Sequence, residues 1–300
     1  METPMQPLSP AQILAVWETG RPQHALDRAL TILAAATPGA SRAALADLPI
    51  GERDARLLRL RRLVFGAEAE GFAECPNCGE RVEFPLDLAA LAPPPAPPEG
   101  RASARPANAP AEYTTETSGI TLRFRVPTSR DLAKVVSAPN SSVALRTLVT
   151  RCVFSPNESL SRSHPEPRRR RGTSQLPTLD SATADSDLPP PNARSFAALC
   201  QPQDHNPGEL PAETVEALSR AMIEAAPEAE IILRLTCPAC GHEWDLLFDI
   251  AEFFWREISA QAQRLLREID TLARAYGWTE AEILSLPAQR RQTYLEMLAA

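Results

Sequence analysis

Two stretches of the chain, FAECPNCGERVEFPLDLAAL at residues 72–91 and RLTCPACGHEWDLLFDIAEF at residues 234–253, carry the same pattern. Each contains a strand, a Cys-Pro-x-Cys-Gly turn and a second strand, and an acidic residue, Asp87 or Asp249, follows shortly after. After the first turn, apolar and polar residues alternate with the period of a half-buried strand. The repeat therefore predicts two β-hairpins, each with a pair of cysteines in its turn.

The four cysteines of these turns suit a zinc ion. Zn²⁺ prefers four soft ligands in a tetrahedron with each sulfur about 2.3 Å from the metal, and two intervening residues let one tight turn supply two ligands. The glycine after each pair permits a positive φ, which lets backbone N–H groups turn toward the thiolates. Because four cysteines leave no position for water, we expect one structural Zn²⁺, bound by Cys75, Cys78, Cys237 and Cys240.

The separation of the two pairs is unusual for a zinc ribbon. There are 158 residues between Cys78 and Cys237, whereas the usual interval is about 15–20. A long insertion into the ribbon explains this, since loop-closure entropy grows slowly with length. The alternative is a redox Cys-x-x-Cys motif, which requires a βαβ context with its first cysteine at a helix start. Strands follow both pairs, so the pattern favours zinc.

Three further residues near this chemistry are not expected to bind the metal. His242 would be a fifth ligand, and we interpret it as a surface residue. Cys152 is expected in the core, and Cys200 borders a segment that we expect to be disordered.

Composition narrows the class of protein. The chain has 300 residues, of which 44% are hydrophobic and 23% charged, values typical of a soluble globular protein with one large or two small domains. The apolar content excludes a fully disordered chain. No stretch approaches the ~18–20 apolar residues of a membrane span, and the N-terminus lacks the features of a signal peptide. We therefore expect no membrane partner.

Periodicity and turn signals predict an α+β fold that is mainly helical, with a split four-cysteine zinc ribbon, small β elements and a long disordered insertion. The expected division is an N-terminal helical region (1–66), the split ribbon (67–91 and 229–250), a proline-rich linker (92–111), a β-hairpin with helices (112–154), a disordered loop (155–195), a linker and helix (196–228) and C-terminal helices (251–300).

The N-terminal region predicts two helices within residues 8–36 and a third at about 52–65. The third helix carries several arginines among its leucines. We interpret them as a solvated face, and a docking surface for an acidic partner is the alternative. These arginines are Arg53, Arg56, Arg59, Arg61 and Arg62.

The C-terminal residues 272–298 predict a helical hairpin that rests on a long helix at 250–275. In this arrangement Arg290 and Arg291 fall outside the seam, next to Tyr294. Arginine and aromatic residues are enriched at protein–protein interfaces. Two interpretations remain open: this face docks a neighbouring protein, or the arginines are solvated and the tyrosine closes the core.

Other chemistry is weakly represented. The chain has no Gly-rich phosphate loop, no Gly-x-Ser-x-Gly and no His-Glu-x-x-His, and its four histidines suggest no catalytic set. We expect no enzyme and no small-molecule substrate. A nucleic-acid-binding zinc ribbon is the second hypothesis, but it requires basic and aromatic ribbon strands. The predicted strands are acidic and the net charge is −7, so nucleic acid is disfavoured as a partner.

Three stretches together resemble one family: LPIGERDARLLRLRRLVFG (48–66), ILRLTCPACGHEWDLLFDIAEFFWREI (232–258) and LARAYGWTEAEILSLPAQRRQTYLEML (272–298). The combination resembles the T4-type bacteriophage baseplate proteins of contractile phage tails and contractile injection systems, over about the first 90 and the last 70 residues. The resemblance implies a non-enzymatic structural or assembly component with other baseplate or tail proteins as partners. It also implies a location in the cytoplasm of a bacterial host or within an assembled phage tail-like particle.

Overall fold

The computed structural model describes residues 5–91, 111–117, 120–154 and 212–299. The predicted disordered loop at 155–195 and Cys200 lie outside the described residues, as does nearly all of the predicted linker.

The described chain is α+β, as predicted, and consists mainly of helices with three small antiparallel sheets among the described residues. The helices are α1 (Pro10–Gly20), α2 (Ala25–Ala36), α3 (Arg42–Ala46), α4 (Ile50–Phe65), α5 (Ser129–Val135), α6 (Ser141–Cys152), α8 (Ala212–Ala225), the 3₁₀ turn η2 (Pro227–Ala229), α9 (Ile250–Tyr276), α10 (Glu280–Ser285) and α11 (Ala288–Ala299). The strands are β1 (Glu68–Glu74), β2 (Arg81–Asp87), β3 (Tyr113–Thr117), β4 (Ile120–Phe124), β5 (Val153–Phe154), β6 (Ile231–Thr236) and β7 (Glu243–Phe248).

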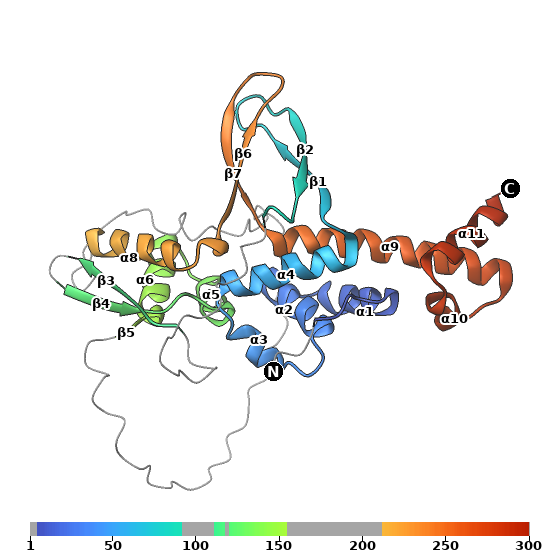
Figure 1. The fold of residues 1–300 in the computed structure, drawn as a ribbon, viewed down its shortest axis with the longest axis horizontal. Helices are drawn as coiled ribbons and strands as arrows, with labels where there is room; N and C mark the ends of the chain where they lie inside the picture. Colours follow the sequence, from blue (N-terminus) through green and yellow to red (C-terminus); the bar gives the residue numbers. More distant parts are fainter. Residues whose placement is uncertain (1–4, 92–110, 118–119, 155–211, 300) are drawn as a thin grey trace, which may run out of the picture.

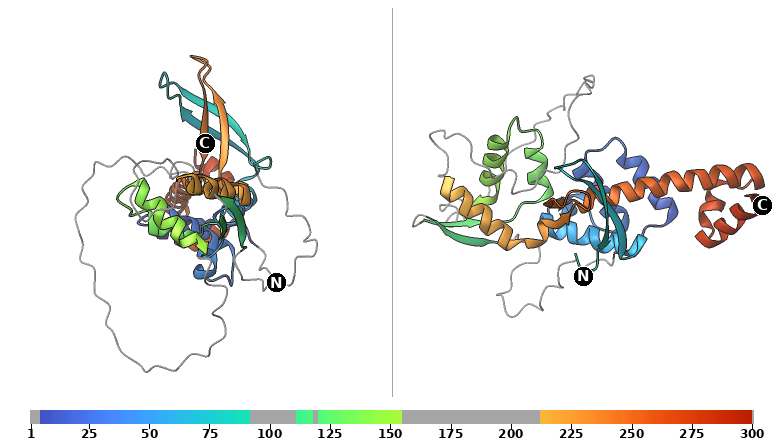
Figure 2. Two further views of the ribbon diagram at one scale, coloured as in Figure 1. Left: turned by 90° about the vertical axis from the view of Figure 1, so that its left-hand side faces the viewer. Right: turned by 90° about the horizontal axis from the view of Figure 1, so that it is seen from above.

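Two β-hairpins, β1–β2 and β6–β7, project together from the helical body (Figures 1 and 2). The first follows α4 and the second leads into α9. The remaining strands form an antiparallel sheet in the order β3-β4-β5. Beyond the body, α9 continues as an arm whose far end is covered by α10 and α11 (Figure 1).

Local sequence signals set the ends of the long helix. The carboxylate of Asp249 accepts hydrogen bonds from the amides of Ala251 and Glu252, which satisfies N–H groups that the helix leaves unpaired. Gly277, at φ 72°, ends the helix in the left-handed conformation. A capping box formed by Thr279 and Glu282 then starts α10.

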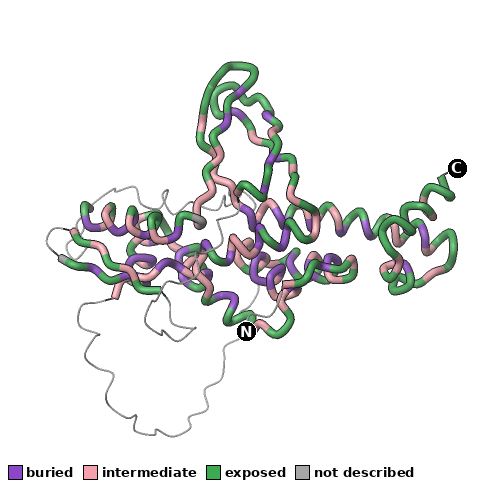
Figure 3. Tube along the Cα trace, viewed as in Figure 1, coloured by how far each residue is buried: buried purple, intermediate pink, exposed green. Residues whose placement is uncertain are grey.

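The main hydrophobic core lies where α1, α2 and α4 pack on the first half of α9. Figure 3 shows this central region as the densest set of buried residues, whereas the hairpin tips and the arm are mostly exposed. Its fully buried side chains include Ile32, Leu33, Leu57, Leu60 and Phe254.

Trp255 of α9 fixes how closely α1 approaches. A Cβ atom added to Gly20 would lie 2.5 Å from the indole ring, which is closer than van der Waals contact allows. On the ring's face, the Arg28 guanidinium lies 4.7 Å from the centroid and also donates to the Gly20 carbonyl. The indole ring of Trp255 is therefore in contact with the backbone of Gly20 and with the guanidinium of Arg28.

A second core joins the three-stranded sheet to α5, α6 and α8, around Phe124, Leu148 and Leu218. Cys152 is fully buried in this core, as predicted. The two cores meet near the start of α4, where the Ile50 amide donates to the Pro127 carbonyl.

Asp131 is the polar centre of the second core. It is fully buried and accepts hydrogen bonds from Arg125, from Arg151 and from both the amide and the hydroxyl of Thr128. Burial raises the pKa of this carboxyl, but the hydrogen bonds from Arg125 and Thr128 outweigh burial and lower the pKa to about 2.

The prediction that the α4 arginines form a solvated face is wrong for Arg53 and Arg61, which are 5% and 3% exposed. Arg53 pairs with the carboxylate of its neighbour Asp54, and Arg61 pairs with Glu257 of α9. Burial is tolerated because the guanidinium donors have acceptors nearby. The short helix α3, which was not predicted, precedes α4.

Replacing Gly20 with alanine is expected to destabilise the protein by about 1–3 kcal/mol through overpacking against Trp255. Helix propensity alone would give a gain of about 1 kcal/mol, so the sign of the change separates the two effects. Urea unfolding measures it. Adding Trp255→Phe should recover part of the loss, and a Gly20→Ala protein that melts at or above the wild-type temperature would contradict the packing account.

Replacing Asp131 with asparagine is expected to cost about 3 kcal/mol at pH 7, because Arg125 loses a buried partner. The matched control is Asp47→Asn, which removes an exposed pair with Arg130 and should cost under about 1 kcal/mol. A lowered folded-state pKa stabilises the protein above the unfolded pKa and loses that effect as pH falls toward 2. The difference between wild type and Asp131→Asn should narrow between about pH 4 and pH 2; a widening difference would refute this assignment.

Candidate metal centre

The two cysteine turns are built in the same way. In the first, between β1 and β2, the Cys75 amide donates to the Glu80 carbonyl at 2.8 Å, and the Gly79 amide donates to the Cys75 carbonyl at 2.9 Å. Gly79 has φ 74°, a conformation that glycine adopts without steric cost. These bonds tie the turn closed with both thiols at its tip.

The second turn, between β6 and β7, repeats these contacts. The Cys237 amide donates to the His242 carbonyl at 2.8 Å, and the Gly241 amide donates to the Cys237 carbonyl at 2.9 Å. Gly241 has φ 70°. The repeat in sequence is therefore a repeat in backbone geometry.

The two turns face each other and bring the four sulfurs together. Sγ of Cys75 lies 3.7 Å from that of Cys240, and Sγ of Cys78 lies 3.6 Å from that of Cys237. All four sulfurs lie within 4.8 Å of one another. A tetrahedron with metal–sulfur bonds of about 2.3 Å has sulfurs about 3.8 Å apart. The spacing fits a single ion bound by all four.

One cysteine of each turn is buried and the other is exposed. Cys75 and Cys237 are 2% and 1% exposed and pack with Val82 and Trp244. Cys78 and Cys240 lie at the solvent side. The arrangement gives the site one closed side and one side through which an ion can enter.

The charge state of the sulfurs favours a cation between them. The backbone hydrogen bond from His242, then the side-chain amide of Asn77, lower the pKa of Cys240 to about 6. A backbone bond from Glu80 acts in the same direction on Cys78, but hydrogen bonds to the neighbouring thiols and desolvation outweigh it and raise its pKa to about 12. One thiolate thus raises the free energy needed to deprotonate the next thiol, and a bound divalent cation would offset this cost.

Asn77 is a contact that the sequence analysis missed. Its side-chain nitrogen lies 3.6 Å from Sγ of Cys240 in the opposite turn. The available signal was a side-chain amide between the two cysteines of the turn, because such an amide can donate a hydrogen bond to a sulfur. His242 is exposed and its ring stacks on Trp244, in agreement with the prediction that it is a surface residue.

The base of the ribbon is anchored by Arg61. Its guanidinium donates to both carboxylate oxygens of Glu257 at 2.8 and 2.5 Å, and to the carbonyls of Gly66 and Glu68 at 2.7 and 2.9 Å. One side chain of α4 therefore joins the start of β1 to α9. The metal site and this anchor lie at opposite ends of the projecting hairpins.

Comparison with known protein families identifies the family to which this chain belongs. The family described as T4 bacteriophage base plate protein matches residues 11–161, which is half of the chain. The chain belongs to this family. Searches of curated proteins and of solved structures found no match.

The family match agrees with the resemblance found in the sequence over about the first 90 residues but does not extend to the last 70. It runs from α1 through β5 and includes Cys75 and Cys78, together with the middle region that the resemblance did not use. It ends before Cys237 and Cys240. The second half of the metal site is therefore supported by geometry rather than by family membership.

The C-terminal hairpin forms as predicted, but Arg291 does not lie outside it. Arg291 is 2% exposed, pairs with Glu268 of α9 at 2.9 Å and donates to the Leu286 carbonyl. Its guanidinium holds α11 against α9, because its N–H groups have acceptors within the protein. Arg290 is exposed and Tyr294 is half-buried.

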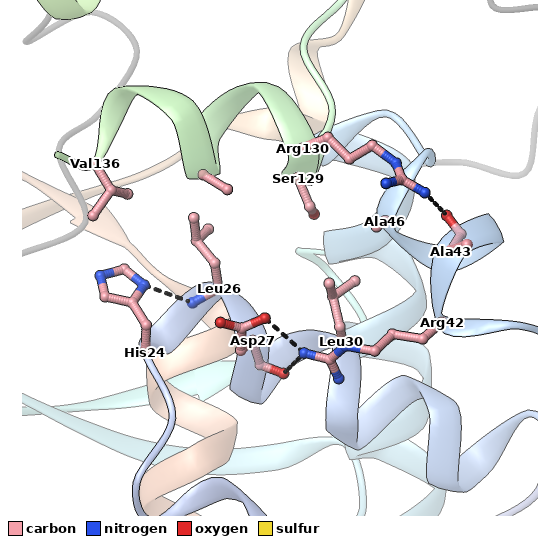
Figure 4. A pocket seen from close by; sticks show the side chains of 11 residues that line it. His24, Leu26, Asp27, Leu30, Arg42, Ala43, Ala46, Ser129, Arg130 and Val136 are labelled. Atoms are coloured by element: carbon pink, nitrogen blue, oxygen red, sulfur yellow. Dashed lines mark hydrogen bonds and ion pairs between the residues drawn. The ribbon is translucent and has the colours of Figure 1, made fainter. Parts of the chain in front are cut away.

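A separate pocket lies between α2, α3 and α5 (Figure 4). It is largely apolar, with Leu26, Leu30 and Val136 among its lining residues. Ion pairs at its rim, Asp27 with Arg42 and Arg130 with Asp47, neutralise the charges around it.

No described helix has both the length and the hydropathy that crossing a membrane requires.

Purified protein is expected to contain about one metal ion per chain, and Cys237→Ser should lose it together with cooperative unfolding of the hairpins, because a structural site contributes folding free energy directly. Elemental analysis and near-ultraviolet circular dichroism measure the two effects. Cys152→Ala is the matched control, with a buried cysteine removed and metal content kept. A metal-free protein with unchanged melting would contradict the site.

Proposed function

We propose that this chain is a non-enzymatic structural or assembly component of the baseplate of a contractile phage tail or a related injection system. Family membership over half of the chain carries the proposal. In this role the protein acts in the cytoplasm of the bacterial host or within the assembled particle, and other baseplate or tail proteins are its partners.

We further propose that the ion between the four cysteines is Zn²⁺ and that it is structural. The donor set is four thiolates, which suits zinc, and it leaves no open position for water or substrate. The residues Cys75, Cys78, Cys237 and Cys240 would hold the ion, and its chemistry would be that of a crosslink between two hairpins.

A baseplate component needs a stable shape and surfaces for neighbours, and the fold supports both. The hairpins join segments on either side of a long insertion, and α9 extends well beyond the body (Figure 1). At its end, Tyr276, Trp278 and Tyr294 form an aromatic cluster with ring centroids 4.6–5.5 Å apart. We propose that this end of the arm docks a neighbouring component.

The exposed residues at the end of the arm form the proposed docking face. Arg290 is exposed, Met297 is 63% exposed, and Tyr294 lies beside them on α11. Arg291 contributes by holding α11 to α9 through Glu268. A residue with this position supports the face without contacting a partner.

The alternative, a nucleic-acid-binding zinc ribbon, is disfavoured by charge. Glu68, Glu70, Glu74, Glu83 and Asp87 are exposed on the first hairpin, where such a protein requires basic residues.

Deleting the gene in its native host is expected to abolish particles with complete baseplates in electron micrographs, and the wild-type gene should restore them. Mass spectrometry of tagged protein should identify baseplate or tail proteins. Arg290→Ala with Met297→Ser should lose those partners while melting and metal content stay unchanged. Arg256→Ala, exposed elsewhere on α9, is the control. Normal particles after deletion would contradict the proposed function; normal particles in the double variant would contradict only the docking face.

A further inference from the structure

One face of the β1–β2 hairpin is fully exposed. Along both strands, side chains alternate between an inner face, where Val82 and Leu86 are buried, and an outer face open to solvent. We call the second of these the outer face; it consists of the alternate residues from Glu68 to Glu74 and from Arg81 to Asp87. In Figure 3 the hairpin stands clear of the helical body, so no helix of the described chain covers this face.

The outer face concentrates negative charge beyond what folding requires. It carries five carboxylates and a single arginine; the carboxylates are Glu68, Glu70, Glu74, Glu83 and Asp87. Glu68 lies directly opposite Asp87 in the strand register. Like charges at opposed positions destabilise a hairpin. The face therefore has an electrostatic cost that a cationic partner would relieve.

Phe72 lies at the centre of these charges. Its side chain is 54% exposed, although a phenylalanine on an isolated hairpin gains nothing from contact with water. Glu70 and Glu74 flank it on the same strand, and Glu83 is its partner across the hairpin. The arrangement is an aromatic ring bordered by carboxylates on three sides.

The ring already accepts a guanidinium. The Cζ atom of Arg81 lies 4.4 Å from the centroid of Phe72, and its Nε lies 3.7 Å from Glu83. Arg81 itself is 62% exposed, so this pairing is made at the open surface. Arginine stacks on aromatic rings while it pairs with carboxylates, a combination that the ammonium group of lysine matches less well.

We propose that the outer face binds an arginine-bearing segment of a partner protein, whose guanidinium contacts the part of the Phe72 ring that Arg81 leaves exposed and pairs with the surrounding carboxylates. Charge complementarity selects this occupant, since a phosphate polymer would meet five carboxylates. The proposal does not depend on the baseplate assignment and names a different surface from the arm.

Fluorescence anisotropy of full-length, metal-loaded protein with labelled hexa-arginine amide and hexa-lysine amide at low salt tests the proposal. Wild type should bind the arginine peptide more tightly than the lysine peptide. Phe72→Ala should weaken arginine-peptide binding about threefold, at unchanged net charge. Phe72→Leu, which keeps an apolar side chain but removes the aromatic ring, should lose the preference for the arginine peptide over the lysine peptide. The double variant Glu70→Gln with Glu83→Gln should weaken binding of the arginine peptide about fivefold.

Two controls match these variants. Ile232→Ala removes a side chain of similar exposure, 58%, from the other hairpin, and Glu280→Gln with Glu296→Gln removes two charges from the arm. Both should bind within about twofold of wild type. Circular dichroism and metal content confirm that each variant is folded.

Four results would overturn the proposal. They are absence of binding by either peptide, binding by Phe72→Ala equal to wild type, equal weakening by Ile232→Ala, and a large gain in affinity when glycines replace the chain's own run of four consecutive arginines, Arg168–Arg171. The last result would identify the chain's own arginine run as the occupant instead of a partner.

Discussion

The structure depends on four sulfur atoms meeting between two turns that lie 158 residues apart in sequence. Each hairpin alone is a two-stranded sheet, which is marginally stable in water. Their inner faces bury Val82 and Leu235 but leave much of each hairpin exposed. A cation bound by the four thiolates would crosslink the hairpins at their tips, and Arg61 joins the first of them to α9 at its base. Because α9 begins directly after β7, such a crosslink would also fix the point at which the long helix leaves the ribbon.

This arrangement explains how the chain can carry a long insertion without losing its architecture. The closure entropy of a loop rises by only about 0.6 kcal/mol for each doubling of its length, so the segment between the hairpins can vary at low cost. The main core is built from the two ends of the chain, α1, α2 and α4 on one side and α9 on the other. The second core, around Phe124 and Asp131, lies within the insertion and contacts the first at the start of α4.

Much of this fold could be predicted from local sequence signals. The β6–β7 hairpin, the Asp249 cap and the Thr279 capping box follow from short-range patterns, and the four cysteines meet as their spacing indicated. The errors concern arginines. Arg61 and Arg291 are buried because Glu257 and Glu268 lie opposite them on α9, and those partners are 196 and 23 residues away. Periodicity on one helix cannot reveal an acceptor on another. The sequence shows an amide donor at Asn77, but not that its acceptor, Cys240, lies in the opposite turn.

The central claim is that one zinc ion is bound by all four cysteines and has no further ligand. Zinc K-edge X-ray absorption on the purified full-length protein tests it directly. The account predicts a single shell of four sulfur ligands at about 2.3 Å, with no nitrogen or oxygen ligand. A mixed shell that includes nitrogen or oxygen, or a protein whose Cys75 and Cys240 are joined in a disulfide without metal, would contradict it.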